Sequence, residues 1–144
     1  MLRTLSILGL AIMVLALAGL FSTHALLSSS RAVITVQVAA VALLIWARTT
    51  FGIRSFHASA GPTEGGLVTT GPYAFIRHPI YTAVSLFGWA GILAHWSVRS
   101  ISLGILLLAG ALVRMLCEER LVVERYPQYR QYAARTKRMV PYLF

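Results

Sequence analysis

Residues 79–117 read PIYTAVSLFGWAGILAHWSVRSISLGILLLAGALVRMLC, and this stretch decides the fold. It holds two apolar segments, 79–98 and 100–117, and Arg99 is the charge that separates them. A membrane-spanning helix needs about 20 predominantly apolar residues, so each segment has close to the required length. A connection of about one residue leaves no room for a crossover. The stretch therefore predicts two antiparallel transmembrane helices joined in a tight hairpin.

Two more apolar segments precede this hairpin, over residues 4–27 and 32–50. The first contains no Lys, Arg, Asp or Glu, and the second contains Arg48 as its charged residue. A signal peptide also begins with a basic residue and an apolar run. The length of the first segment and the spans that follow it favour a retained helix. We expect an all-α integral membrane protein, residues 1–144 forming a single domain with four transmembrane helices.

The segment after the hairpin, residues 118–144, alternates charged and aromatic side chains and is expected to form a cytoplasmic helical tail. Pro127 should divide it into two short helices, because proline disrupts a helix interior. Residues 58–71 (ASAGPTEGGLVTTG) are rich in Gly, Ser and Thr and predict a loop between the second and third spans. Gly88, Gly91, Gly104 and Gly110 lie within the spans, where small residues allow helices to approach closely.

Composition supports a membrane protein rather than a soluble one. Hydrophobic residues make up 58% of the chain and charged residues 12%, about half the charge of a typical soluble domain. The net charge is +9. With so apolar a chain, this charge favours anionic lipid head groups as partners over nucleic acid. Cys117 is the single cysteine, which excludes an internal disulfide and a cysteine-built metal site, and nothing else in the sequence requires a metal.

The basic residues define an orientation for the four expected spans. Eleven of the 13 Lys and Arg residues fall on the side that holds both termini and the 51–78 loop, whereas Arg31 and Arg99 fall on the other side. Cytoplasmic loops carry an excess of Lys and Arg. The sequence therefore predicts that the N- and C-termini are cytoplasmic.

Two clusters of polar residues lie at the cytoplasmic ends of the hairpin. One, at 71–81, contains Gly71-Pro72-Tyr73, Arg77-His78-Pro79 and Tyr81, and the other begins at Glu118-Glu119. Because the two helices have nearly equal expected lengths, Arg77 and His78 should face the two glutamates at one depth. Pro79 suits the first position of a helix, and a helix N-terminus favours anions whereas a helix C-terminus favours cations.

The two clusters together would thus offer both signs of charge to one ligand at the bilayer interface. A ligand that carries a carboxylate, an ammonium and a sulfonium, such as S-adenosylmethionine, matches that pattern. The alternative is structural. In that case Arg77 and Tyr81 only anchor the interface, and the glutamates only pair with Arg114 or Arg120.

The motif at 71–81, Gly-Pro-Tyr-x3-Arg-His-Pro-x-Tyr, resembles the signature of the isoprenylcysteine carboxyl methyltransferase family. Glu118-Glu119, the Tyr129/Tyr132 tail and the run from Arg138 to Pro141 resemble it too. The wider group includes phospholipid N-methyltransferases and bacterial membrane proteins. The resemblance covers about residues 66–144, and the chain resembles a short, bacterial-type member that lacks the extra N-terminal spans of eukaryotic members.

This resemblance implies an S-adenosylmethionine-dependent membrane methyltransferase, expected in a bacterial inner membrane. It implies that the cofactor pocket is lined by Tyr73, Arg77, His78, Pro79, Tyr81, Glu118 and Glu119. The acceptor would be a lipophilic small molecule or a lipid-linked carboxylate, thiol or amine, and no proton-transfer residue is assigned. Two other functions are compatible with the sequence: an NADPH-dependent membrane reductase of the sterol-reductase type, and a non-enzymatic membrane scaffold. The sequence does not indicate the oligomeric state.

Overall fold

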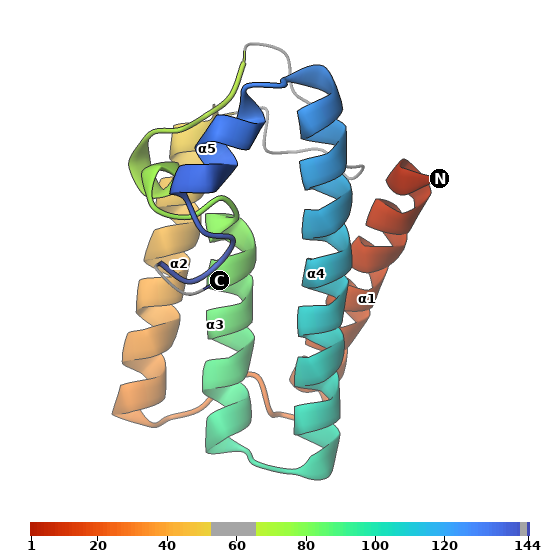
Figure 1. Cartoon of the computed structure of the whole chain (residues 1–144). Coiled ribbons are helices and arrows are strands. Elements are labelled where there is room, and N and C mark those ends of the chain that lie inside the picture. The colour runs from red at the N-terminus through yellow and green to blue at the C-terminus, as the bar shows by residue number, and fades with distance from the viewer. Residues whose placement is uncertain (53–65, 142–143) are drawn as a thin grey trace.

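The computed structural model describes residues 1–52, 66–141 and 144. Within these residues the chain is helical, without strands: α1 (Leu2–Ser22), α2 (Arg31–Phe51), the 3-10 helix η2 (Gly71–Ala74), α3 (Pro79–Ala94), α4 (Val98–Arg125) and α5 (Tyr129–Arg135). The four longest helices run alternately in opposite directions, and α5 lies across one end of them (Figure 1). The all-α prediction is confirmed. Most of the loop expected at 58–71 lies outside the described residues.

Three helices, α1, α2 and α4, are long and apolar enough to cross a membrane. The third expected span, 79–98, is shorter than the sequence suggested, because α3 ends at Ala94 after 16 residues, or about 24 Å of helix. The turn lies at residues 95–97 and not at Arg99. Ser97 caps α4: its hydroxyl accepts from the Ser100 N–H, and the Ser100 hydroxyl accepts from the Ser97 N–H. This capping box starts α4 at Val98, before the charged residue.

Helix α4 is also longer than expected. It has 28 residues, about 42 Å at 1.5 Å per residue, and it passes through Glu118 and Glu119 to Arg125. The prediction that a separate helical tail begins at residue 118 is therefore wrong. The chain leaves the helix at Tyr126, whose extended conformation (φ −129°, ψ 86°) is the one that a residue before proline prefers. Pro127 does separate two helices, α4 and the short α5.

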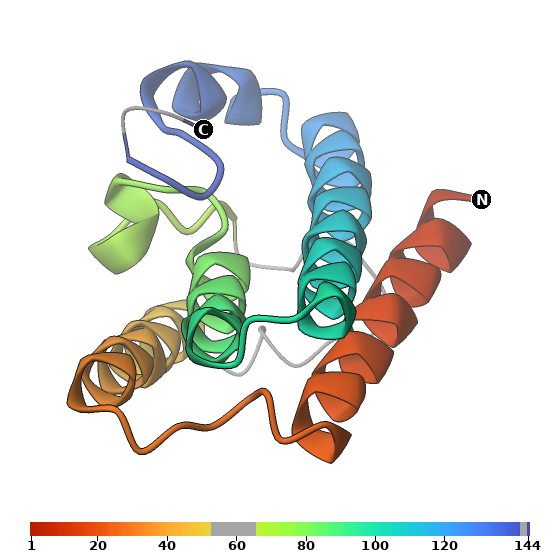
Figure 2. The ribbon, with the colours of Figure 1, turned by 90° about the horizontal axis from the view of Figure 1, so that it is seen from below.

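The helices pack in two pairs, α1 against α4 and α2 against α3, and α3 and α4 touch over a smaller area. Glycines permit the closest approaches. A Cβ atom built on Gly110 would lie 2.7 Å from the Gly9 carbonyl oxygen, and one on Gly91 would lie 2.3 Å from the Leu26 carbonyl oxygen. Because glycine has no side chain, neighbouring backbones can approach this closely within a membrane. Seen along the helix axes, α3 and α4 lie side by side, with α1 and α2 on either flank (Figure 2).

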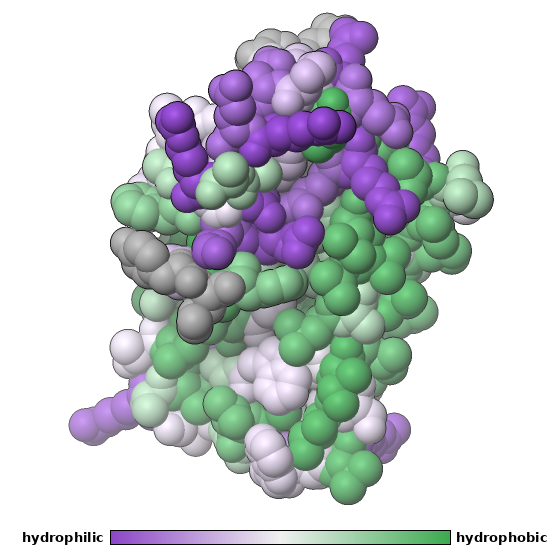
Figure 3. All heavy atoms as spheres, in the orientation of Figure 1, coloured by the Kyte–Doolittle hydropathy of each residue, from purple (hydrophilic) through white to green (hydrophobic). Residues whose placement is uncertain are grey.

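Hydrophilic and hydrophobic residues lie in different parts of the molecule along the helix axes. Hydrophilic residues gather at the end that carries α5 and the last turns of α4, and hydrophobic residues cover most of the remaining surface (Figure 3). Exposed apolar side chains include Ile34, Val38, Leu108 and Leu112, as expected for helices that face lipid. This distribution supports an integral membrane protein whose polar end lies at one face of the bilayer.

The close contact of α1 with α4 predicts that a single methyl group added at this contact destabilises the protein. Gly110→Ala should lower the free energy of unfolding by about 1–3 kcal/mol, because the new Cβ meets backbone that cannot move aside. Gly19→Ala is the matched control, since its Cβ would meet only the flexible end of Leu103. Thermal unfolding in detergent measures the stability of both variants. Equal midpoints for the two variants would contradict the inferred packing of α1 on α4.

Candidate functional site

The polar residues of the two motifs meet where α3 begins. Residues 76–78 lie outside any helix, and His78 (φ −127°, ψ 55°) precedes Pro79, the first residue of α3. A residue before proline avoids the helical region, so the helix does not begin earlier. The N–H groups of Arg77 and His78 then need acceptors outside the helix.

The C-terminal segment supplies those acceptors. The Arg77 N–H donates to the Lys137 carbonyl (2.7 Å), and the His78 N–H donates to the Arg138 carbonyl (2.9 Å). One turn into α3, the Thr82 hydroxyl donates to the Met139 carbonyl at 2.9 Å. Residues 137–139 are thereby fixed beside the start of α3, although about 60 residues separate the two segments in sequence.

Glu119 is the acceptor on which three segments converge. It accepts from Arg77 Nε at 2.9 Å, from Arg138 Nη2 at 3.0 Å, and lies 3.2 Å from His78 Nε2. Its side chain is 13% exposed and that of Arg77 is 9% exposed. Both carboxylate oxygens are occupied, Oε1 mainly by Arg77 and Oε2 by Arg138. Glu119 therefore joins α4, the start of α3 and the C-terminal segment.

Glu118 faces a different set of groups. Its Oε1 accepts from the Tyr81 hydroxyl and lies 3.2 Å from Arg114 Nε, which also donates to the Tyr81 hydroxyl. Its Oε2 lies 3.8 Å from His78 Nδ1. The Glu118 side chain is 25% exposed, nearly twice as exposed as that of Glu119. Of the two carboxylates, Glu118 is the one with an oxygen, Oε2, that accepts no hydrogen bond from a described residue.

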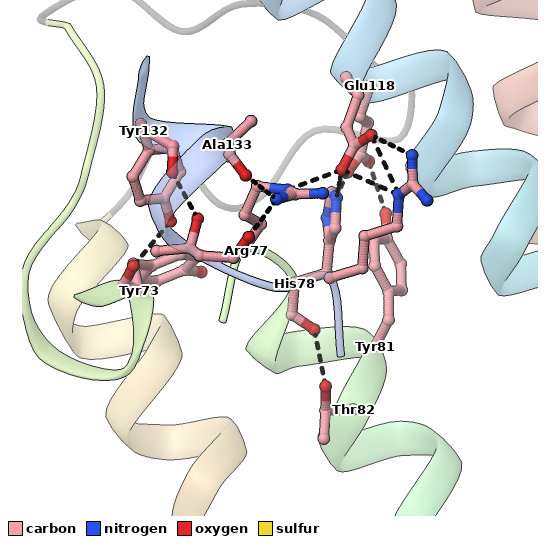
Figure 4. A network of polar contacts seen from close by, with 11 residues as sticks. Tyr73, Arg77, His78, Tyr81, Thr82, Glu118, Tyr132 and Ala133 are labelled. Carbon is pink, nitrogen blue, oxygen red and sulfur yellow. Dashed lines mark hydrogen bonds and ion pairs between the residues drawn. The ribbon is translucent and has the colours of Figure 1, made fainter. Parts of the chain in front are cut away.

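Helix α5 covers one side of this network. Arg77 Nη1 donates to the carbonyls of Ala133 and Thr136, and the Tyr132 hydroxyl donates to the Tyr73 carbonyl at 2.7 Å (Figure 4). Burial raises the pKa of the Tyr132 phenol to about 12, and it raises the pKa of Tyr73 and Tyr129 as well. These phenols stay protonated at neutral pH, so the Tyr132 hydroxyl can act as a hydrogen-bond donor.

The structure brings together five of the seven residues singled out in the sequence: Arg77, His78, Tyr81, Glu118 and Glu119. Of the other two, Pro79 starts α3, and Tyr73 lies beside α5 with its ring 5.4 Å from that of Phe51. The opposite charges pair with one another. Glu118 pairs with Arg114, one of the partners named in the structural alternative, whereas Glu119 pairs with Arg77, His78 and Arg138.

Two contributors were not among those candidates. Arg114 is 6% exposed and holds both Tyr81 and Glu118. Its position four residues before Glu118, on the same face of a helix, is the signal that indicates the pairing. Arg138 stood in the quoted C-terminal motif, but its contact with Glu119 depends on how the tail folds back, which no local pattern indicates.

Comparison with known proteins relates this site to a family. Residues 31–129 match the family model of phospholipid methyltransferases. The chain belongs to the phospholipid methyltransferase family. This family lies within the isoprenylcysteine carboxyl methyltransferase-like group, so the resemblance read from the two motifs is confirmed. The match contains the 71–81 motif and Glu118-Glu119, and it ends at the first residue of α5, before Tyr132 and the run from Arg138 to Pro141.

Two curated relatives share part of the chain. Cobalt-zinc-cadmium resistance protein CzcN of Cupriavidus metallidurans is 30% identical over 87 residues, which are 58% of this chain and 39% of the relative. Nickel-cobalt-cadmium resistance protein NccN of Alcaligenes xylosoxydans xylosoxydans is 32% identical over 87 residues, 58% of this chain and 40% of the relative. The chain thus spans about two-fifths of the length of these relatives. No solved structure matches the chain.

The convergence on Glu119 predicts that this residue holds the C-terminal segment in place. Glu119→Gln leaves the buried Arg77 guanidinium without an anion and should destabilise the fold by about 3 kcal/mol. Limited trypsin digestion should then cut faster after Lys137 and Arg138. Glu124→Gln is the matched control, because Glu124 is exposed on the same helix. An unchanged digestion rate in Glu119→Gln would show that the ion pairs do not hold the tail.

Proposed function

We propose that this protein is an integral membrane methyltransferase that uses S-adenosylmethionine and acts on a lipophilic small molecule or lipid-linked acceptor. The observation that carries the proposal is the family match over residues 31–129, which contains the 71–81 motif and the Glu118-Glu119 pair. Further support comes from the position of the site, at the polar end of helices whose sides are apolar. The family match gives methyl transfer precedence over the reductase and scaffold functions that the sequence alone leaves open.

The charged groups of the site fit those of S-adenosylmethionine, which carries a carboxylate, an ammonium and a sulfonium. Glu118 suits a positive group, because its Oε2 accepts no hydrogen bond from a described residue and lies 3.8 Å from His78 Nδ1. Arg138 suits the carboxylate, because its side chain is 32% exposed whereas that of Arg77 is 9% exposed. Arg77 and His78 then act mainly as positioning residues, which hold the two glutamates in place through the contacts described above.

When bound, the cofactor supplies a methyl group on a positively charged sulfur, which makes the methyl carbon electrophilic. The protein has to align the acceptor with that carbon and exclude water, and alignment contributes about 7–11 kcal/mol in favourable cases. The network around Glu118 and Glu119 suits this task, because its side chains restrain one another. A carboxylate or thiolate acceptor requires no general base, whereas an amine has to arrive uncharged.

The position of the site favours an acceptor that is dissolved in the bilayer. The Tyr81 side chain is 9% exposed and packs in an apolar cluster with Met115, Leu107 and Met139, directly beneath the ion pairs. Polar groups that bind the cofactor thus lie next to apolar groups at the depth of the bilayer surface. A lipophilic acceptor reaches this depth without leaving the membrane.

Ligand binding tests the proposal directly. Calorimetric titration of the detergent-purified protein should show binding of S-adenosylmethionine and S-adenosylhomocysteine and no binding of NADPH. Binding of NADPH alone would favour the reductase. Failure of all three ligands to bind a folded protein would favour the scaffold.

The exposure of Glu118 predicts that removing its charge weakens cofactor binding. Glu118→Gln should weaken S-adenosylmethionine binding about tenfold or more, because a hydrogen bond to a charged group contributes about 1.5–3 kcal/mol. Dissociation constants from calorimetry measure this loss, and thermal unfolding checks that the variant is folded. Glu124→Gln again serves as the control. Full affinity in Glu118→Gln, with binding intact in the control, would remove Glu118 from the cofactor site.

A further inference from the structure

The C-terminal segment that covers the site has two faces of opposite character. On the inner face Tyr129 and Thr136 are buried, 7% and 6% exposed. The outer face carries three exposed cations, here called the tail cations: Arg130, Arg135 and Lys137. Tyr132 is half-buried and donates to the Tyr73 carbonyl, so the inner positions 129, 132 and 136 recur three, four and seven residues apart, as on one side of a helix. The inner face accounts for the docking of the segment and leaves the outer face for another partner.

The tail cations lack a counter-charge in the described part of the chain. Two of its glutamates, Glu118 and Glu119, already pair with groups of the site. The third, Glu124, is exposed and makes no ion pair with a described residue. The tail cations likewise make no ion pair or side-chain hydrogen bond there. Three neighbouring unpaired cations provide an attractive surface for an external anion.

The depth of the segment indicates which anion lies closest. Lys137 pairs through its backbone with Ile76 and Arg77, just before α3 enters the apolar part of the molecule. Two large apolar side chains lie close in sequence to this backbone pairing and are exposed: Phe75 at 60% and Val140 at 44%. Cations beside exposed aromatic and aliphatic side chains are typical of a surface at the boundary between head groups and acyl chains. At this depth the abundant anions are lipid phosphates.

We propose that the tail cations bind the head groups of anionic phospholipids and thereby hold the C-terminal segment on the site. The same segment offers the Ala133 and Thr136 carbonyls to Arg77 and carries Arg138, the partner of Glu119. A lipid that binds the docked segment better than the released one stabilises the docked state by linkage. Lipid composition would then control how completely the site is assembled. This proposal does not rest on methyltransferase activity.

The test compares nanodiscs of phosphatidylcholine with nanodiscs of about 70% phosphatidylcholine and 30% phosphatidylglycerol, in which juxtamembrane cations attract the anionic lipid. Three proteins are compared: the wild type, R130Q/R135Q/K137Q, and R31Q/R99Q. The last removes two exposed cations from the opposite end of the bundle and is the matched control. Native mass spectrometry measures retained phosphatidylglycerol, and trypsin digestion after Arg138 measures release of the tail. Because Gln substitution removes trypsin sites, only cleavage after Arg138 is compared.

We expect phosphatidylglycerol to slow cleavage after Arg138 in the wild type and in R31Q/R99Q, and to have little effect in R130Q/R135Q/K137Q. Affinity for the lipid should fall about fivefold for each cation removed, since each contributes about 1 kcal/mol near an anionic surface. R130K/R135K, which keeps the charge, should behave as the wild type. Equal retention of phosphatidylglycerol by the wild type and R130Q/R135Q/K137Q would overturn the proposal, as would an equal loss in R31Q/R99Q.

Discussion

The structure depends on a need to neutralise buried guanidinium groups at the end of an apolar bundle. Arg77 and Arg114 are 9% and 7% exposed at their side chains, and a buried charge is costly unless it is paired. Glu119 and Glu118 supply the paired anions, one for each arginine. Arg77 precedes α3 and Glu119 lies on α4, so this ion pair fixes α4 against the start of α3. Arg114 and Glu118 both lie on α4, and they contact α3 through the Tyr81 hydroxyl. The main packing of α4 is on α1, so without these ion pairs α3 and α4 would have little to hold their polar ends together.

The short α3 makes room for the rest of the site. It extends about 24 Å, whereas α4 extends about 42 Å and rises well above it. Residues 76–78 precede α3 outside any helix, and they place Arg77 and His78 in contact with the glutamates. Backbone N–H groups outside a helix need other acceptors, and the C-terminal segment provides carbonyl acceptors for two of them. One consequence of the short helix is therefore that the tail has a place to dock.

The sequence correctly predicted which residues near α3 and α4 meet. The helix lengths on which that prediction relied differ from the observed ones. The expected hairpin had helices of nearly equal length, yet the contact between Arg77 and Glu119 arises from a short helix, α3, preceded by non-helical residues, and a long helix, α4. The opposite charges of these groups and their expected location on one side of the membrane were enough to predict that they meet. The tail was less predictable, because its role rests on backbone carbonyls such as those of Ala133 and Thr136, which any residue would carry. Such pairing over long sequence separations leaves no local signal.

The two glutamates show why adjacent identical residues need not share a role. Successive residues of an α-helix point about 100° apart, so Glu118 and Glu119 face different neighbours. Glu118 faces Tyr81 and Arg114 and keeps an open oxygen, whereas Glu119 faces Arg77 and Arg138 and has both oxygens occupied. His78 lies between them, with Nδ1 toward Glu118 and Nε2 toward Glu119. In one network, Glu119 therefore supports the fold of the site, and Glu118 is the carboxylate best placed to meet a ligand.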